Sequence, residues 1–130
     1  MQTLLGWLLR QVFKPKAAKM TAAEGDQAIL AQLRHAGADL DRPREVVHFL
    51  YVPSQEASRK AAETLRPHGY SVEERPAADA AKKPPNPFLV KATSETTLNP
   101  WAVQQFRQLF EQLAATHAGE YDGWEAAAQP

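Results

Sequence analysis

Apolar residues recur every three or four positions in three segments of the chain, and capping residues bound each segment. This spacing places the apolar side chains on one face of a helix. Ser and Asn side chains accept hydrogen bonds at a helix start, and glycine often ends a helix because it adopts positive φ readily. The expected starts and ends are Thr21 or Asp26 to Gly37, Ser54 to Gly69, and Asn99 (followed by Pro100) to Gly119. The predicted buried faces are Ile29, Leu30 and Leu33; Ala57, Ala61, Ala62 and Leu65; and Val103, Phe106, Phe110, Leu113 and His117.

Three other segments have the composition and alternation of β-strands: Glu45–Val52, Tyr70–Arg75 and Phe88–Thr93. The first is rich in β-branched and aromatic residues, which predicts a central strand buried on at least one face. Its alternation places Val46, His48, Leu50 and Val52 on one side and Val47, Phe49 and Tyr51 on the other. The segment 76–87 contains four prolines, so it predicts a long exposed loop and not a tight hairpin turn.

The order of these elements predicts an α+β fold of the ferredoxin-like, split β-α-β type. Two strands joined by one helix form a right-handed crossover, and the third strand can lie between them, antiparallel to both. Helices would then cover one face of an antiparallel sheet. The tail Tyr121–Ala128 can add a short fourth strand. The N-terminal helices would lie at an edge of the sheet or on its open face.

Residues 1–20 differ from the rest of the chain and predict an amphipathic, basic N-terminal extension before a single α+β domain at 21–130. The apolar stretch is too short to cross a bilayer, which takes about 20 residues. Three interpretations stay open: the helix packs on its own domain, it contacts a membrane surface or another protein through residues 1–14, or it is a poorly ordered extension and Met20 is the true start. Its apolar face would comprise Leu4, Leu5, Leu8, Leu9, Val12 and Phe13.

The formal net charge is zero over 130 residues, but the charge is unevenly distributed. The first 20 residues carry four basic residues and no acid, whereas the remainder holds 11 Lys and Arg against 15 Asp and Glu. A body with a net charge of −4 is poorly suited to phosphate backbones and better suited to a basic protein partner. There is no cysteine, which excludes a disulfide, a thiolate metal site and a cysteine nucleophile and suits a cytoplasmic location.

Motifs for catalysis or cofactor binding are missing from the sequence. The four histidines, His35, His48, His68 and His117, lack the spacing of a zinc-binding helix, so we expect no metal site and no cofactor. There is no glycine-rich phosphate loop and no nucleophile elbow, so no catalytic residue is assigned. His48 is interpreted as a core histidine. The sequence favours a protein that is not an enzyme, with a small enzyme lacking a recognisable motif as an alternative.

A ferredoxin-like sheet also makes RNA binding a candidate function, since RNA-recognition modules stack bases on sheet aromatics beside basic residues. Here the central strand offers Phe49 and Tyr51, and the third strand offers Phe88 and Lys91. The sequence lacks the glycine and aromatic spacing of such modules. A sheet-face RNA-binding module therefore remains an alternative, and we expect no direct nucleic-acid partner.

The most distinctive stretch lies near the end of the chain, where two aromatic residues flank a predicted Asp122-Gly123 turn. One interpretation is structural: Tyr121 and Trp124 fold back over the core. The other is an exposed aromatic and acidic patch that binds a basic partner. The candidate partner-binding residues are Glu120, Tyr121, Asp122, Trp124 and Glu125.

These residues also carry a family resemblance. The sequence YDGWE, after a long helix that ends in Ala-x-x-His-Ala-Gly-Glu, resembles the regulator of ribonuclease activity B family. Upstream, Glu24-Gly-Asp26, the strand in 43–51 and Gly69-Tyr-Ser-Val fit as well, so the resemblance covers roughly 24–127. The leucine-rich N-terminus and the proline-rich loop depart from the family pattern. The resemblance implies a small cytoplasmic bacterial protein with a ferredoxin-like fold that inhibits ribonuclease E by binding the enzyme and not its RNA. The implied partner is a ribonuclease E-type endonuclease or another basic RNA-processing protein.

Overall fold

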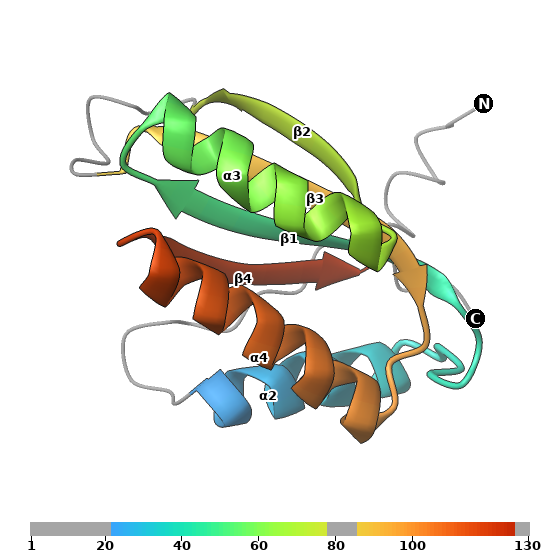
Figure 1. The fold of residues 1–130 in the computed structure, drawn as a ribbon. Helices are drawn as coiled ribbons and strands as arrows, with labels where there is room; N and C mark the ends of the chain where they lie inside the picture. The colour runs from blue at the N-terminus through green and yellow to red at the C-terminus, as the bar shows by residue number, and fades with distance from the viewer. Residues whose placement is uncertain (1–21, 78–85, 127–130) are drawn as a thin grey trace.

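The computed structural model describes residues 22–77 and 86–126. The predicted extension at 1–20, most of the proline-rich loop and the last residues of the tail lie outside the described residues. Every helix and strand predicted within the described part is present (Figure 1). The elements are α2 (Ala22–His35), β1 (Arg44–Val52), α3 (Gln55–Leu65), the short 3-10 helix η1 (Arg66–His68), β2 (Ser71–Pro76), β3 (Phe88–Thr96), α4 (Pro100–Thr116) and β4 (Glu120–Ala126).

The four described strands form one sheet in the order β2-β3-β1-β4, and every neighbouring pair is antiparallel. The strands β1 and β2 therefore run in the same direction, with β3 between them. This topology confirms the predicted ferredoxin-like α+β fold, and β4 confirms the fourth strand. The strand β3 is three residues longer than predicted, because it continues beside β1 through Thr96.

The helices α3 and α4 lie on the same face of the sheet, and α2 lies beside α4 at the β4 side of the domain (Figure 1). This position of α2 agrees with the predicted placement at an edge. The core fills the space between the sheet and the helices. The core includes the predicted inward side of β1, because the side chains on that side are each fully buried: Val46, His48, Leu50 and Val52.

Local hydrogen bonds explain why the helices begin where they do. The Ser54 hydroxyl accepts from the backbone N–H of Ala57 at 3.1 Å, and the Asn99 side chain accepts from that of Ala102 at 2.8 Å. Both caps were predicted. Each satisfies a backbone donor that the helix itself leaves unpaired.

The end of α4 differs from the prediction. The residue with positive φ is Ala118, at 53°, and not Gly119. The Gly119 N–H donates to the Ala114 carbonyl at 2.8 Å, which closes the last turn as a Schellman motif does. Gly119 is needed for a different reason: a Cβ at this position would lie 2.4 Å from the Tyr51 carbonyl oxygen.

Candidate functional site

The YDGWE segment is an extended strand with one irregularity, and the predicted Asp122-Gly123 turn is wrong. The segment forms β4, which pairs with β1. Leu50 pairs with Tyr121 and His48 with Trp124, so Asp122 and Gly123 together lie opposite a single β1 residue. This is a β-bulge, and Gly123 has φ 95°. The extra residue lets two aromatic side chains three positions apart point to the same face of the sheet.

Trp124 is fully buried and belongs to the core. Its indole N–H donates to an Asp26 carboxylate oxygen at 2.9 Å. The same carboxylate also accepts two hydrogen bonds from the Arg107 guanidinium, one of them at 2.7 Å. The Phe106 ring packs edge-on against the indole, with centroids 5.4 Å apart. Asp26, 4% exposed, therefore joins α2 to α4 and β4.

Tyr121 lies half-buried in an aromatic cluster around His48. Its hydroxyl is hydrogen-bonded to His48 Nδ1 at 2.8 Å, and its ring stacks on Phe110 at 5.0 Å. The Arg107 guanidinium lies over the Tyr121 ring, 5.3 Å from its centroid. Burial raises the pKa of Tyr121 well above its ordinary value, so the hydroxyl stays protonated at neutral pH.

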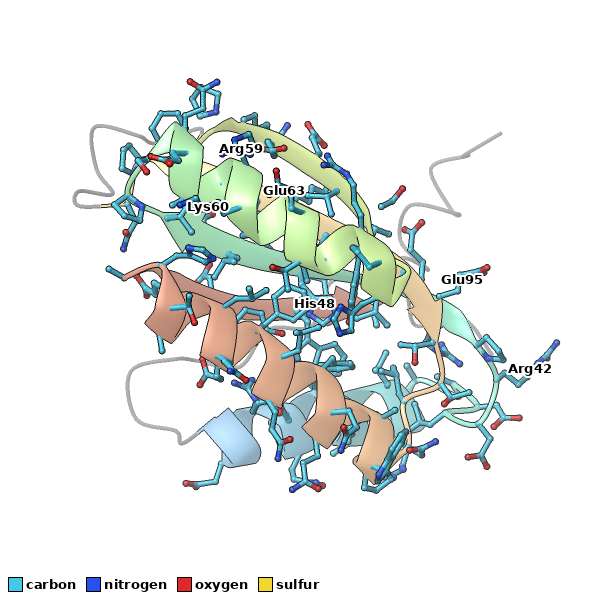
Figure 2. The ribbon with its side chains drawn as sticks, viewed as in Figure 1. Arg42, His48, Arg59, Lys60, Glu63 and Glu95 are labelled. Carbon is cyan, nitrogen blue, oxygen red and sulfur yellow. The ribbon has the colours of Figure 1, made fainter. Side chains whose placement is uncertain are left out.

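His48 is a core histidine, as predicted, and Figure 2 shows it between the sheet and the helices. Its ring stacks on Phe110 with centroids 4.2 Å apart. Burial, with a smaller contribution from the positive charge of Arg107, lowers the pKa of His48 from 6.5 to about 3. The ring is therefore neutral at physiological pH and packs as an aromatic side chain.

These contacts divide the predicted partner-binding set into two groups. Trp124 cannot form part of an exposed patch, because its side chain is enclosed by α2, α4 and the sheet. Tyr121 directs its hydroxyl to the core. For these two residues the structure agrees with the structural interpretation. The three carboxylates of the set, Glu120, Asp122 and Glu125, retain at least partial exposure.

The sheet register places two of these carboxylates on the open side of the sheet, away from the helices. Glu120 pairs with Tyr51 and Glu125 with Val47, and these β1 residues alternate with the buried side of that strand. Glu45 follows on the same side of β1 and lies directly opposite Glu95 of β3. An acidic band thus crosses one end of the open face from Glu125 through Glu45 to Glu95.

The open face also carries part of the predicted RNA-binding set. Phe49 pairs with Lys91, so the two share this face with Tyr51. Phe88 pairs with Val52 and therefore points to the helix side. The predicted combination of Phe88 with Lys91 is wrong, because the side chains of residues three positions apart on a strand point to opposite faces of the sheet.

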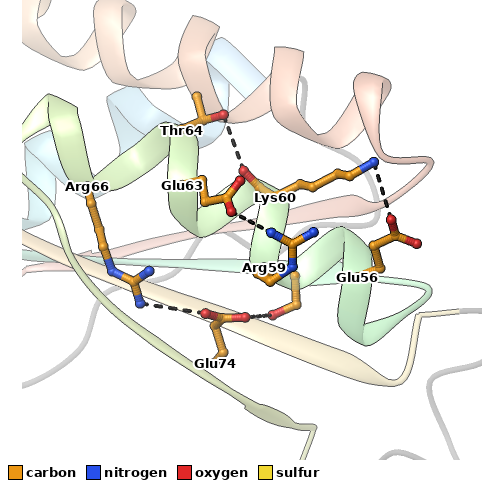
Figure 3. A network of polar contacts seen from close by, with 8 residues as sticks. Glu56, Arg59, Lys60, Glu63, Thr64, Arg66 and Glu74 are labelled. Carbon is orange, nitrogen blue, oxygen red and sulfur yellow. Dashed lines mark hydrogen bonds and ion pairs between the residues drawn. The ribbon is translucent and has the colours of Figure 1, made fainter.

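The outer surface of α3 is charged but internally paired, as Figure 3 shows. Arg59 pairs with Glu63, and Lys60 lies 3.4 Å from Glu56. Arg66 contacts Glu74, which also accepts from the Ser58 hydroxyl at 2.9 Å. Each basic side chain here already faces a carboxylate, so the helix presents mixed charge and no phosphate-binding patch.

Sequence reasoning missed Asp26 and Arg107, although both left a signal. Asp26 precedes Ile29, Leu30 and Leu33 at helical spacing, so it lies on the apolar stripe of its helix. Arg107 lies on the stripe of α4, four residues after Val103 and three before Phe110. A charged residue on a buried stripe signals a buried partner.

Within residues 22–77 and 86–126, no group of His, Asp and Glu is arranged to hold a metal ion, and no helix is long and apolar enough to cross a membrane. These observations define a small ferredoxin-like α+β domain whose buried polar groups join its helices to its sheet. Residues 23–126 match the model of the family described as regulator of ribonuclease activity B, and the chain belongs to that family. A search of curated proteins finds no match. Family membership places the chain among regulators of ribonuclease activity.

Proposed function

We propose that this chain is a non-catalytic, protein-binding regulator that inhibits or modulates a ribonuclease E-type endonuclease, and so RNA turnover. The family match supports the regulatory role. The partner would be that endonuclease or another basic RNA-processing protein, and the site of action would be the cytoplasm.

The observation that carries the binding mode is the acidic edge of β4. Glu120 and Glu125 lie on the open side of the sheet beside Tyr51 and Val47, while the neighbouring aromatic residues of the motif anchor the strand in the core. The core contacts hold the backbone of β4 in place, so the carboxylates are presented from a rigid strand. A rigid acidic edge suits a basic, flexible protein segment, since charge complementarity speeds association and selects the partner.

The test is a double variant, Glu120→Gln with Glu125→Gln, in binding to a basic segment of the endonuclease. We expect affinity to fall several-fold and its dependence on salt to flatten, because two charges that attract the partner are lost. Thermal stability should change by no more than about 0.5 kcal/mol at Glu120, which is exposed, and any larger change in the double variant would come from Glu125, which is half-buried. The matched control is Glu56→Gln with Glu63→Gln on α3, which changes the net charge equally on another surface. Equal effects of the two double variants would show that only net charge matters.

A second candidate is RNA binding on the open face, favoured by the shared face of Phe49, Tyr51 and Lys91. Phosphate binding would give a steep loss of RNA affinity with salt. We expect no RNA complex even at low salt, because the same face carries the acidic band. A complex with a steep salt dependence would favour this second function instead.

A further inference from the structure

The strand β3 extends beyond the neighbour that pairs with one of its edges. The pairing of β2 with β3 starts at Ser71 opposite Thr93, whereas β3 continues to Thr96 beside β1 (Figure 1). On the side away from β1, no strand of the described chain pairs with residues 94–96. Backbone N–H groups alternate between the two sides of a strand, so at least one N–H in 94–96 faces this gap. Such an edge is a template for an added strand.

This gap is an open groove with a volume of about 570 Å³. Residues 94–96 line it together with Tyr70 on one side and one face of α4, from Trp101 to Gln112, on the other. The Tyr70 ring packs edge-on against His48 and Phe110, with centroids 5.6 Å and 5.4 Å apart, which holds that wall against the core. Three exposed amide side chains of α4, those of Gln105, Gln108 and Gln112, also line the groove and can donate and accept hydrogen bonds.

Trp101 lines this groove and has no role in the core. Its side chain is 70% exposed, and it is the one large apolar residue so exposed within residues 22–77 and 86–126. The buried stripe of α4 starts at Val103, so the position of Trp101 is not set by packing against the sheet. Exposed tryptophan beside unpaired strand backbone is typical of peptide recognition, where aromatic residues supply much of the binding energy.

The charges around the groove favour a basic partner. No Lys or Arg lines it. Glu95 projects outward at the end of β3 (Figure 2) and lies directly opposite Glu45. Glu95 is exposed, so a basic side chain of a bound segment can pair with its carboxylate, as opposite charges on neighbouring strands do. The acidic band on the open face runs from this end of β3 across β1 to β4.

We propose that this groove binds an extended, basic peptide segment of the protein partner, which adds to the edge of β3 at residues 94–96. An apolar side chain of that segment packs on Trp101, and a Lys or Arg lies beside Glu95. The inference rests on the proposed function in one respect: the segment belongs to the ribonuclease E-type endonuclease. The backbone of β3 would supply affinity, and the flanking side chains would supply specificity.

The first part of the test measures binding of the intact chain to the purified, full-length endonuclease. Trp101→Ala should weaken binding about tenfold or more, as loss of a tryptophan hot spot does, and Glu95→Gln should weaken it several-fold. The matched control is Gln104→Ala, an exposed position of α4 that does not line the groove, and it should bind within twofold of the wild type. Unchanged affinity in both groove variants, with the wild type still binding, would overturn the groove proposal alone.

The second part follows amide hydrogen exchange in the isotopically labelled chain. Strand addition predicts slower exchange at one or more of residues 94–96 in the complex, because new backbone hydrogen bonds form there. A complex without slowed exchange at these residues would exclude strand addition even if Trp101 contributes. If the wild type does not bind the endonuclease at all, the proposed function itself fails.

Discussion

The substitution Asp26→Ala tests the polar network that joins α2 to the rest of the domain. The carboxylate is 4% exposed and accepts three hydrogen bonds, two from Arg107 and one from Trp124. Removal leaves the fully buried indole N–H without an acceptor, which costs about 1–3 kcal/mol. Breaking a buried ion pair costs about 3–5 kcal/mol, but the Arg107 side chain is 19% exposed and also lies 3.6 Å from Glu111. Arg107 can therefore recover part of its loss, and we expect about 3–4 kcal/mol in total.

Urea unfolding followed by circular dichroism measures this cost. Asp26→Asn keeps one acceptor oxygen and the shape of the side chain, so its cost should be smaller than that of alanine. Gln27→Ala, at an exposed position of the same helix, is the control and should stay within about 0.5 kcal/mol. A cost below about 1 kcal/mol for Asp26→Ala would refute the reasoning, because the carboxylate would then not hold α2 in place.

Three further predictions concern a buried titratable group and the two residues at the end of α4. Between about pH 6.5 and pH 3 the unfolded chain binds a proton at His48 that the folded protein excludes, so His48 alone should lower the free energy of unfolding by about 1.4 kcal/mol per pH unit on acidification. The slope should be smaller in His48→Gln, and equal slopes in the two proteins would show that His48 is protonated in the fold. Ala118→Gly should stabilise the protein by about 0.5–1 kcal/mol, since it relieves the positive φ of 53°. Gly119→Ala should destabilise it, because its Cβ would meet the Tyr51 carbonyl at 2.4 Å, and thermal unfolding that reverses this order would contradict both expectations.

Local signals account for the parts of the fold that could be predicted. The caps Ser54 and Asn99 act on residues three positions away, and the alternation along β1 depends on that strand alone. The topology followed from the order of elements and the handedness of the crossover. These interactions are short-range, so the sequence contains them directly.

The candidate site could be predicted only in part, because its organisation depends on long-range contacts. The buried indole of Trp124 donates a hydrogen bond to Asp26, which lies 98 residues earlier in the chain. The bulge at Gly123 depends on the pairing of β4 with β1. From its neighbours in the sequence alone, the dipeptide Asp122-Gly123 predicts a turn. The length of β3 beyond β2 also depends on the neighbouring strands. The composition of the acidic patch was visible in the sequence, but which residues face solvent was not.

The central claim is that the chain acts on a ribonuclease by binding the enzyme. The most direct measurement titrates the chain into a purified ribonuclease E-type endonuclease at two concentrations of a short RNA substrate and follows cleavage. We expect cleavage to fall to a plateau at an amount of chain that tracks the enzyme concentration and not the RNA concentration. An amount that scales with RNA, or unchanged cleavage at every ratio, would contradict the account.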